Sequence, residues 1–190
     1  MAKKKKSDAS VVLNWLIGDS SDVISLMEGV LLSEILLGHD GASLSKALVE
    51  SKLGEDISPV SGLETELRYM LFSAGLRGIE PKKAKKLEKC VFSVLKKLAK
   101  KGIPQEDVDA AIFSIDFSNR EIKRSHGPYS LVLMRRILQG WLHGKHPAAC
   151  LDTAAAFQVV KEKIAKEGQA YLKDLIKKRF LENTHRTLVT

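Results

Sequence analysis

Residues 11–38, VVLNWLIGDSSDVISLMEGVLLSEILLG, contain the two hydrophobic periods on which the fold depends. The first seven residues alternate with a period of two and are rich in β-branched and aromatic side chains, which predicts a strand. A Gly-Asp pair follows, and apolar residues then return with the 3.6-residue spacing of a helix that ends at Gly38. Ser20 or Ser21 is the expected N-cap of this helix. A strand followed directly by such a helix predicts a helix packed on a sheet.

The rest of the chain continues this alternation of strands and helices. Two adjacent strands are expected between Ile57 and Ile79, and a last strand at 186–190. Helices are expected at about 43–53, 81–102, 104–115, 131–138, 153–164 and 172–176. Strands that neighbour each other along the chain pair antiparallel. The predicted fold class is therefore α+β, an antiparallel sheet with helices packed on one face, which leaves the other face free for a partner.

Length and composition are those of an ordinary folded domain. The chain has 190 residues, of which 44% are hydrophobic and 28% charged, so a core can form without disulfides or metals. We expect a basic start at 1–9, where Lys3 to Lys6 look like a flexible or truncated end, and one α+β domain at 10–190. No apolar run approaches the ~20 residues of a membrane span, so no membrane partner is expected. With only two cysteines, a reducing intracellular compartment is favoured, either the cytoplasm or an organelle matrix.

The net charge of +8 is unevenly distributed. Besides Lys3 to Lys6, nine lysines lie between Lys82 and Lys101. A basic stripe can neutralise phosphates, so a nucleic-acid- or polyanion-binding module is the alternative interpretation of this chain. Base stacking needs exposed aromatic rings, however, and Phe92 is the only aromatic residue on this helix, beside its apolar stripe. We therefore interpret the lysines as a solvated helix face and do not expect nucleic acid as a partner.

Sequence motifs of catalysis and cofactor binding are missing. We find no zinc motif of the His-Glu-x-x-His type or its inversion, no phosphate-binding or dinucleotide-binding glycine loop, and no Gly-x-Ser-x-Gly. His143, His146 and Cys150 offer three potential metal ligands within eight residues, so a small metalloenzyme is a third interpretation. Because Pro147 interrupts any helix that could align them, we expect a capped helix end there. His39 is expected to be a loop histidine. No catalytic, cofactor-binding or metal-binding residue is predicted.

Several segments, in order, resemble one family. Residues 13–23 (LNWLIGDSSDV), 31–81 and 85–142 resemble the second domain of pitrilysin/insulinase-type zinc peptidases, in the presequence-protease subgroup. The resemblance runs from about Val11 to Thr190. In the third segment, the residues that correspond to the subgroup's pattern are Phe117, Ser118, Arg120, Glu121, Pro128, Leu131, Leu133, Met134 and Trp141.

The resemblance implies a division of labour between domains. In this family two halves, joined by a helical hairpin, close around a peptide, and each half contains two related α+β domains. Zinc belongs to the first domain, and a transition-state-stabilising arginine and tyrosine belong to the last. The present chain is similar to the non-catalytic domain that completes the first half and ends before the hairpin. His185 and Arg186 superficially resemble a late family motif, but they align with the domain's own closing strand.

The expected function follows from that resemblance. The chain would be a structural domain of a zinc metalloendopeptidase that degrades unfolded peptides, would form part of the chamber wall, and would be inactive alone. Its partners would be the remaining domains of the same peptidase and the unfolded peptide substrates. Arg77, Arg120 and Glu121 are the polar candidates for chamber or interdomain contacts, with structural salt bridging as the expected alternative for each.

Overall fold

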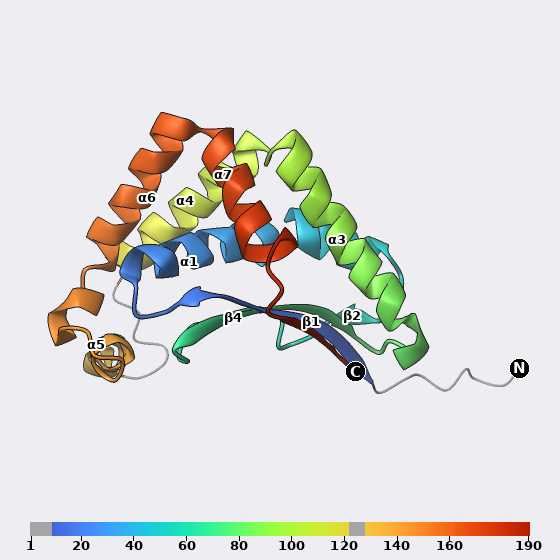
Figure 1. Cartoon of the computed structure of the whole chain (residues 1–190), viewed down its shortest axis with the longest axis horizontal. Coiled ribbons are helices and arrows are strands. Elements are labelled where there is room, and N and C mark those ends of the chain that lie inside the picture. Colours follow the sequence, from blue (N-terminus) through green and yellow to red (C-terminus); the bar gives the residue numbers. More distant parts are fainter. Residues whose placement is uncertain (1–8, 122–127) are drawn as a thin grey trace, which may run out of the picture.

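Helices cover one face of an antiparallel sheet and leave the other face bare (Figure 1). This computed structural model describes residues 9–121 and 128–190. The strands are β1 (Ser10–Asp19), β2 (Asp56–Ile57), β3 (Gly62–Glu64), β4 (Tyr69–Arg77) and β5 (Arg186–Val189). The helices are α1 (Val23–Leu37), α2 (Ser43–Glu50), α3 (Ala84–Lys101), α4 (Gln105–Arg120), α5 (Tyr129–Trp141), α6 (Thr153–Glu167) and α7 (Gln169–Ile176). Three short turns of helix complete them: η1 (Pro81–Lys83), η2 (Pro147–Cys150) and the π-helical η3 (Lys177–Leu181). The predicted α+β class is confirmed.

The two long strands β1 and β4 form the centre of the sheet. The strand order is β2-β4-β1-β5, and β3 also pairs with β4. Every pairing is antiparallel, with Trp15 opposite Phe72 and Leu13 between Ala74 and Leu188. Because side chains alternate between the two faces of a strand, these residues all point toward the helices. The last strand of the chain therefore lies directly beside the first.

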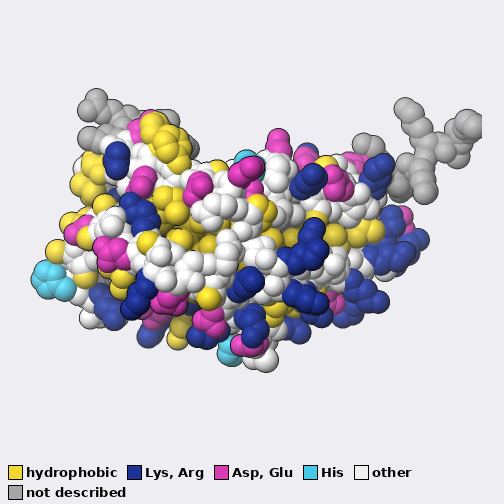
Figure 2. Space-filling model, turned by 90° about the horizontal axis from the view of Figure 1, so that it is seen from above, with side chains coloured by type: hydrophobic (Ala, Val, Ile, Leu, Met, Phe, Trp, Pro, Cys, Tyr) yellow, Lys and Arg dark blue, Asp and Glu magenta, His cyan; other side chains and the backbone are white. Residues whose placement is uncertain are grey.

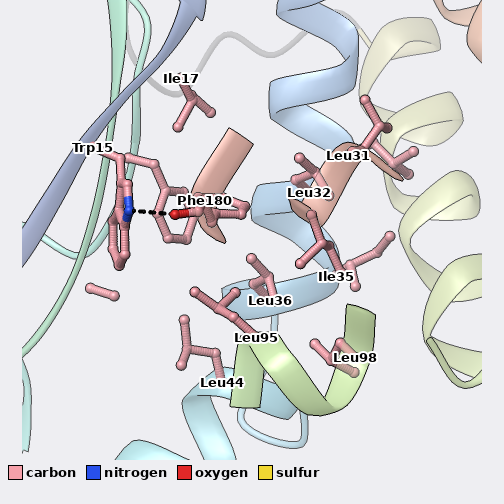
Figure 3. Close-up of a cluster of buried hydrophobic side chains, with 14 of the residues drawn as sticks. Trp15, Ile17, Leu31, Leu32, Ile35, Leu36, Leu44, Leu95, Leu98 and Phe180 are labelled. Carbon is pink, nitrogen blue, oxygen red and sulfur yellow. Dashed lines mark hydrogen bonds between the residues drawn. The ribbon is translucent and has the colours of Figure 1, made fainter. Parts of the chain in front are cut away.

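A buried cluster joins the sheet to the helical layer (Figure 3). Trp15 is fully buried, and its ring makes edge contacts with the rings of Phe92 and Phe180 at centroid distances of 6.0 and 5.5 Å. The indole Nε1 donates a 3.2 Å hydrogen bond to the carbonyl oxygen of Phe180, so the polar atom of this large side chain is also satisfied. Leucine and isoleucine side chains of α1, α2 and α3 fill the space beyond Phe180.

Three predicted details are corrected by the structure. The N-cap of α1 is Asp22, whose Oδ1 accepts from the backbone N–H groups of Ile24 and Ser25. Ser20 and Ser21 lie before this N-cap, and their hydroxyls donate to Leu67 O and Asp19 Oδ1. The second helix ends at Glu50 rather than near residue 53. The segment expected to hold two strands holds three, since two very short strands pair along the same edge of β4.

The predicted domain boundary lies at the limit of the described residues. Residues 1–8, which include Lys3 to Lys6, and residues 122–127 are outside them. A basic start at 1–9 and a domain at 10–190 therefore stay a prediction. Among the helices that the structure describes, none has the length and apolar character that crossing a membrane requires.

Candidate functional site

One face of the sheet is not covered by the helical layer (Figure 1). The residues of β1, β4 and β5 that alternate with those facing the helices point to this face: Val12, Asn14, Leu16, Leu71, Ser73, Thr187 and Val189, of which Val12 and Ser73 are themselves buried. Leu16 is 43% exposed, and at the centre Ser73 Oγ donates a 2.6 Å hydrogen bond to Asn14 Oδ1. The middle of the face is therefore apolar and neutral-polar, and charged side chains such as Arg77 and Glu64 lie at the ends of strands.

A hollow of 400 Å³ adjoins this face near the start of β5. Asn14, Leu16 and Leu71 line it from the two central strands, and His185 and Thr187 line it from the other side. The lining therefore combines apolar side chains with hydrogen-bonding side chains. An extended, uncharged polypeptide segment, which has apolar side chains and backbone N–H and C=O groups, matches such a lining. The bare face and its hollow, which we call the open sheet face, form the candidate functional surface.

A buried ionic cluster holds the helical layer onto the sheet. Glu28 on α1 is only 7% exposed, and its carboxylate accepts hydrogen bonds from Tyr171 Oη at 2.6 Å and from Arg179 Nη2 at 2.6 Å. Lys163 Nζ adds a third contact at 3.3 Å. We call Glu28, Lys163, Tyr171 and Arg179 the charge clamp. It connects α1 to α6, α7 and η3.

Arg179 also reaches the central strand of the sheet. Its Nη1 donates to the carbonyl oxygen of Ile17, next to an irregularity in the β1–β4 register between Leu16 and Gly18. The guanidinium occupies the space that a Cβ at residue 18 would need, which explains why glycine stands there. The π-helical turn η3 places Arg179 in this position while its neighbour Phe180 enters the core.

The charge clamp is suited to structure rather than to proton transfer. Burial alone would raise the pKa of Glu28, but hydrogen bonds from Tyr171 and Arg179 outweigh it and hold that pKa below its ordinary value. Burial, and then the hydrogen bond to Glu28, raise the pKa of Tyr171. Glu28 therefore stays ionised and Tyr171 stays protonated. These are the protonation states in which the Tyr171 hydroxyl donates its hydrogen bond to the Glu28 carboxylate. No sequence pattern singles out the four residues of the charge clamp as a cluster.

The histidine and cysteine cluster does not have the chemistry of a zinc site. His146 is the N-cap of η2, and its Nδ1 accepts from the backbone N–H of Ala148 at 3.3 Å. Cys150 is buried, and burial raises the pKa of its thiol, whereas zinc binds the thiolate. Within residues 9–121 and 128–190, no group of three His, Cys, Asp or Glu side chains is arranged to hold a metal ion, His143, His146 and Cys150 included. We derive no zinc chemistry from this chain.

The lysine-rich helix α3 presents its charges to solvent. Leu87, Val91 and Leu95 are fully buried beneath it. In Figure 2, which looks down on the helical side, Lys and Arg side chains gather over the end where α3 lies in Figure 1. Phe92 is no free stacking platform, because Trp15 contacts one part of its ring and the guanidinium of Arg186 lies 5.0 Å from its centroid. These contacts leave no aromatic surface on α3 for a nucleic-acid base.

The remaining polar candidates lie in three separate places. Arg77 on β4 forms a 2.7 Å ion pair with Asp56 on β2, which is a structural salt bridge across the sheet. Arg120 is exposed at the end of α4, and the backbone N–H of Glu121 caps that helix by donating to Phe117 O. His39 is exposed in the turn after α1. The structure therefore does not bring these side chains together on the open sheet face.

The sequence profile of the family described as the peptidase M16 inactive domain matches residues 2–115. The chain belongs to this family. The resemblance stated from the sequence is therefore confirmed. An uncharacterized protein of Borreliella burgdorferi is 34% identical to this M16 inactive domain over 189 residues, which are 98% of the chain but 19% of the relative. Presequence protease 1 of Arabidopsis thaliana, chloroplastic/mitochondrial, is 32% identical over 186 residues, 97% of the chain and 17% of the relative.

A solved structure shows the same fold in a chain of similar size. The inactive peptidase domain of a Bordetella parapertussis protein described as a zinc protease superimposes with a TM-score of 0.68 at 14% identity, covering 98% of the M16 inactive domain and 92% of that chain. In contrast, the M16 inactive domain spans less than a fifth of the length of the two relatives it matches in sequence. The fold is thus shared with an excised inactive domain and with one part of longer proteins.

Proposed function

We propose that this M16 inactive domain is a wall of the substrate chamber of a larger zinc metalloendopeptidase that degrades unfolded peptides. Membership of an inactive-domain family supports the non-catalytic role. The chain is similar to one part of a presequence protease, which supports a peptidase as the larger protein to which it belongs. Zinc and the water that it polarises would belong to another domain, because the histidines and cysteines that the structure describes form no group that could hold a metal ion.

The observation that carries this proposal is the open sheet face. Its centre has apolar and neutral hydrogen-bonding side chains, such as Leu16 and Asn14, which suit an extended peptide of variable sequence. The charge clamp fixes the helical layer behind it, so the wall is rigid. Rigidity matters for a non-catalytic domain because displacement of a bound substrate by about 1 Å can lower the rate by ~100-fold.

The partners would be the other domains of the same polypeptide and its peptide substrates. The proposal also includes a reducing intracellular compartment for this protein. Cys90 and Cys150 are free thiols, and reduced thiols suit a reducing intracellular compartment.

A crosslinking experiment in the full-length protein tests which face meets the substrate. The photoreactive residue p-benzoylphenylalanine would replace Leu16 on the open sheet face or, as a matched control, Phe113, which is 73% exposed on α4 in the helical layer. We expect a labelled unstructured peptide to crosslink at residue 16 and an excess of unlabelled peptide to compete with it. Equal crosslinking at both positions, or crosslinking at residue 113 alone, would contradict the proposal.

A further inference from the structure

A second cavity, separate from the open sheet face, lies within the helical layer. Its volume is 280 Å³, and it is bounded by α1, α4, α5 and the first residue of α6. Met27, Val30 and Ile115 provide apolar surface in its lining. Ligand sites for drug-sized molecules run from about 300 to 1,000 Å³, so this cavity suits a ligand of about one amino-acid residue.

One polar side chain in this lining has an unsatisfied buried donor. Asn119 on α4 accepts a 3.2 Å hydrogen bond at Oδ1 from the hydroxyl of Thr153. Its Nδ2 is buried and has no hydrogen-bond partner among the described residues. Turning the amide over would satisfy the nitrogen and leave the oxygen without a partner. An unsatisfied buried group of this kind costs about 1–3 kcal/mol, which a ligand acceptor would recover.

An unpaired guanidinium lines the same cavity. Arg136 on α5 is half-buried, and within the described part of the chain it makes no hydrogen bond or ion pair. Its neighbour Arg135 is different, because it pairs with Glu66 and does not line this cavity. A guanidinium offers a planar set of five N–H donors that matches a carboxylate. Arg136 and Asn119 therefore both line this cavity, and among the described residues neither the Arg136 guanidinium nor Asn119 Nδ2 has a hydrogen-bond acceptor.

An acidic group completes the lining. Glu34 on α1 accepts a 3.2 Å hydrogen bond from the hydroxyl of Ser114, and it forms no ion pair with Arg136. The cavity thus contains a cation and an anion that do not neutralise each other directly. A ligand that carries a carboxylate and an ammonium group on the same carbon atom could pair with both.

We propose that this cavity binds the α-carboxylate of an apolar amino-acid residue. Arg136 and Asn119 Nδ2 hold the carboxylate, and the apolar lining formed by Met27, Val30 and Ile115 receives the side chain. The carboxylate can come from a free amino acid, whose ammonium group pairs with Glu34, or from the C-terminal residue of a peptide. The inference does not depend on the open sheet face or on the proposed role in a peptidase.

A titration of the ¹⁵N-labelled chain, followed by NMR, tests the ligand chemistry. The probes are L-leucine, N-acetyl-L-leucine and L-leucinamide. We expect the first two to shift the side-chain NH₂ signals of Asn119 in a saturable way, and leucinamide, which lacks the carboxylate, to bind at least about tenfold more weakly. Tighter binding of leucine than of acetyl-leucine assigns the site to free amino acids, and the reverse order assigns it to peptide C-termini.

Paired arginine variants test the residue assignment. Arg136→Gln is expected to raise the Kd for the better ligand by about tenfold or more, whereas Arg135→Gln leaves it within about twofold. Asn119→Asp places a negative charge beside the ligand carboxylate and is also expected to weaken binding, which is followed through backbone amide signals. The dispersion of each spectrum reports whether the variant is folded. Absence of saturable shifts up to about 50 mM ligand, leucinamide binding as tightly as leucine, or equal losses in the two arginine variants would overturn the proposal.

Discussion

Arg179 Nη2 lies 2.6 Å from Glu28 Oε2, and this ion pair joins the π-helical turn η3 to the first helix across 151 residues of sequence. The same guanidinium donates to the backbone of Ile17 on β1. One side chain therefore connects the two ends of the chain and both layers of the fold. Removing its partner would leave a positive charge largely buried and without compensation, which is among the more costly changes that a single substitution can make.

Glu28→Ala is expected to lower the free energy of unfolding by about 3 kcal/mol, because Arg179 and Tyr171 would lose their shared acceptor. Urea unfolding monitored by circular dichroism measures this change. Glu50→Ala is the matched control. It removes an exposed ion pair with Lys46 and should cost less than about 0.5 kcal/mol. Equal effects of the two substitutions would show that the charge clamp does not hold the layers together.

The contribution of Glu28 should depend on pH in a defined direction. The folded-state pKa of Glu28 lies below its ordinary value of 4.5. A lowered pKa stabilises the fold fully above the unfolded value, and this stabilisation is lost as pH falls through the folded value. The difference in free energy of unfolding between wild type and Glu28→Gln should therefore be constant above about pH 5 and shrink below pH 4.5. A difference that grows on acidification would contradict the assignment.

The two tryptophans should report different environments. Trp15 is fully buried and Trp141 is 58% exposed. In a Trp141→Phe variant, the remaining emission should be blue-shifted and poorly quenched by iodide, because Trp15 is enclosed by aromatic rings and its Nε1 is bonded to Phe180 O. In a Trp15→Phe variant the remaining emission should be red-shifted and strongly quenched. Similar quenching constants for the two variants would be inconsistent with this core.

Gly75 should be sensitive to the addition of a single methyl group. A Cβ at this position of β4 would collide with the carbonyl oxygen of Val11 and lie 2.7 Å from Val12 Cα, both on the paired strand β1. Gly75→Ala is therefore expected to lower stability by about 2 kcal/mol or more, because backbone rather than a flexible side chain must shift. Gly41→Ala, where a new Cβ meets only the ring of His39, provides the comparison in the same thermal or urea assay.

Hydrophobic periodicity was sufficient for the long elements and insufficient for the short ones. The 3.6-residue spacing of Leu87, Val91, Val94, Leu95 and Leu98 predicted a buried helix stripe; four of these residues are buried, and Val94 is partly buried against the core. A strand of two or three residues, such as β2 or β3, is too short to show a period of two. These strands exist because the edge of β4 offers unpaired backbone groups, which is a tertiary effect.

The candidate surfaces were predictable only in outline. The order of strands and helices implied a sheet with one face left free by the helices, and the family resemblance implied that no catalytic residues would be present. The partners of Glu28 could not be foreseen, because Lys163, Tyr171 and Arg179 follow it by 135 to 151 residues and meet it only after the helices have packed. For His146 and Cys150, Pro147 predicted a capped helix end, and the structure has His146 as the N-cap of η2 with Cys150 buried at its end.

The central claim is that this domain is a wall without catalytic groups of its own. The measurement that tests it most directly is cleavage of a fluorescence-quenched, unstructured peptide by the purified 190-residue chain, with added zinc and with or without a chelator. We expect no cleavage above that of a mock preparation in either condition. Cleavage that copurifies with the chain and is abolished by the chelator would contradict the account.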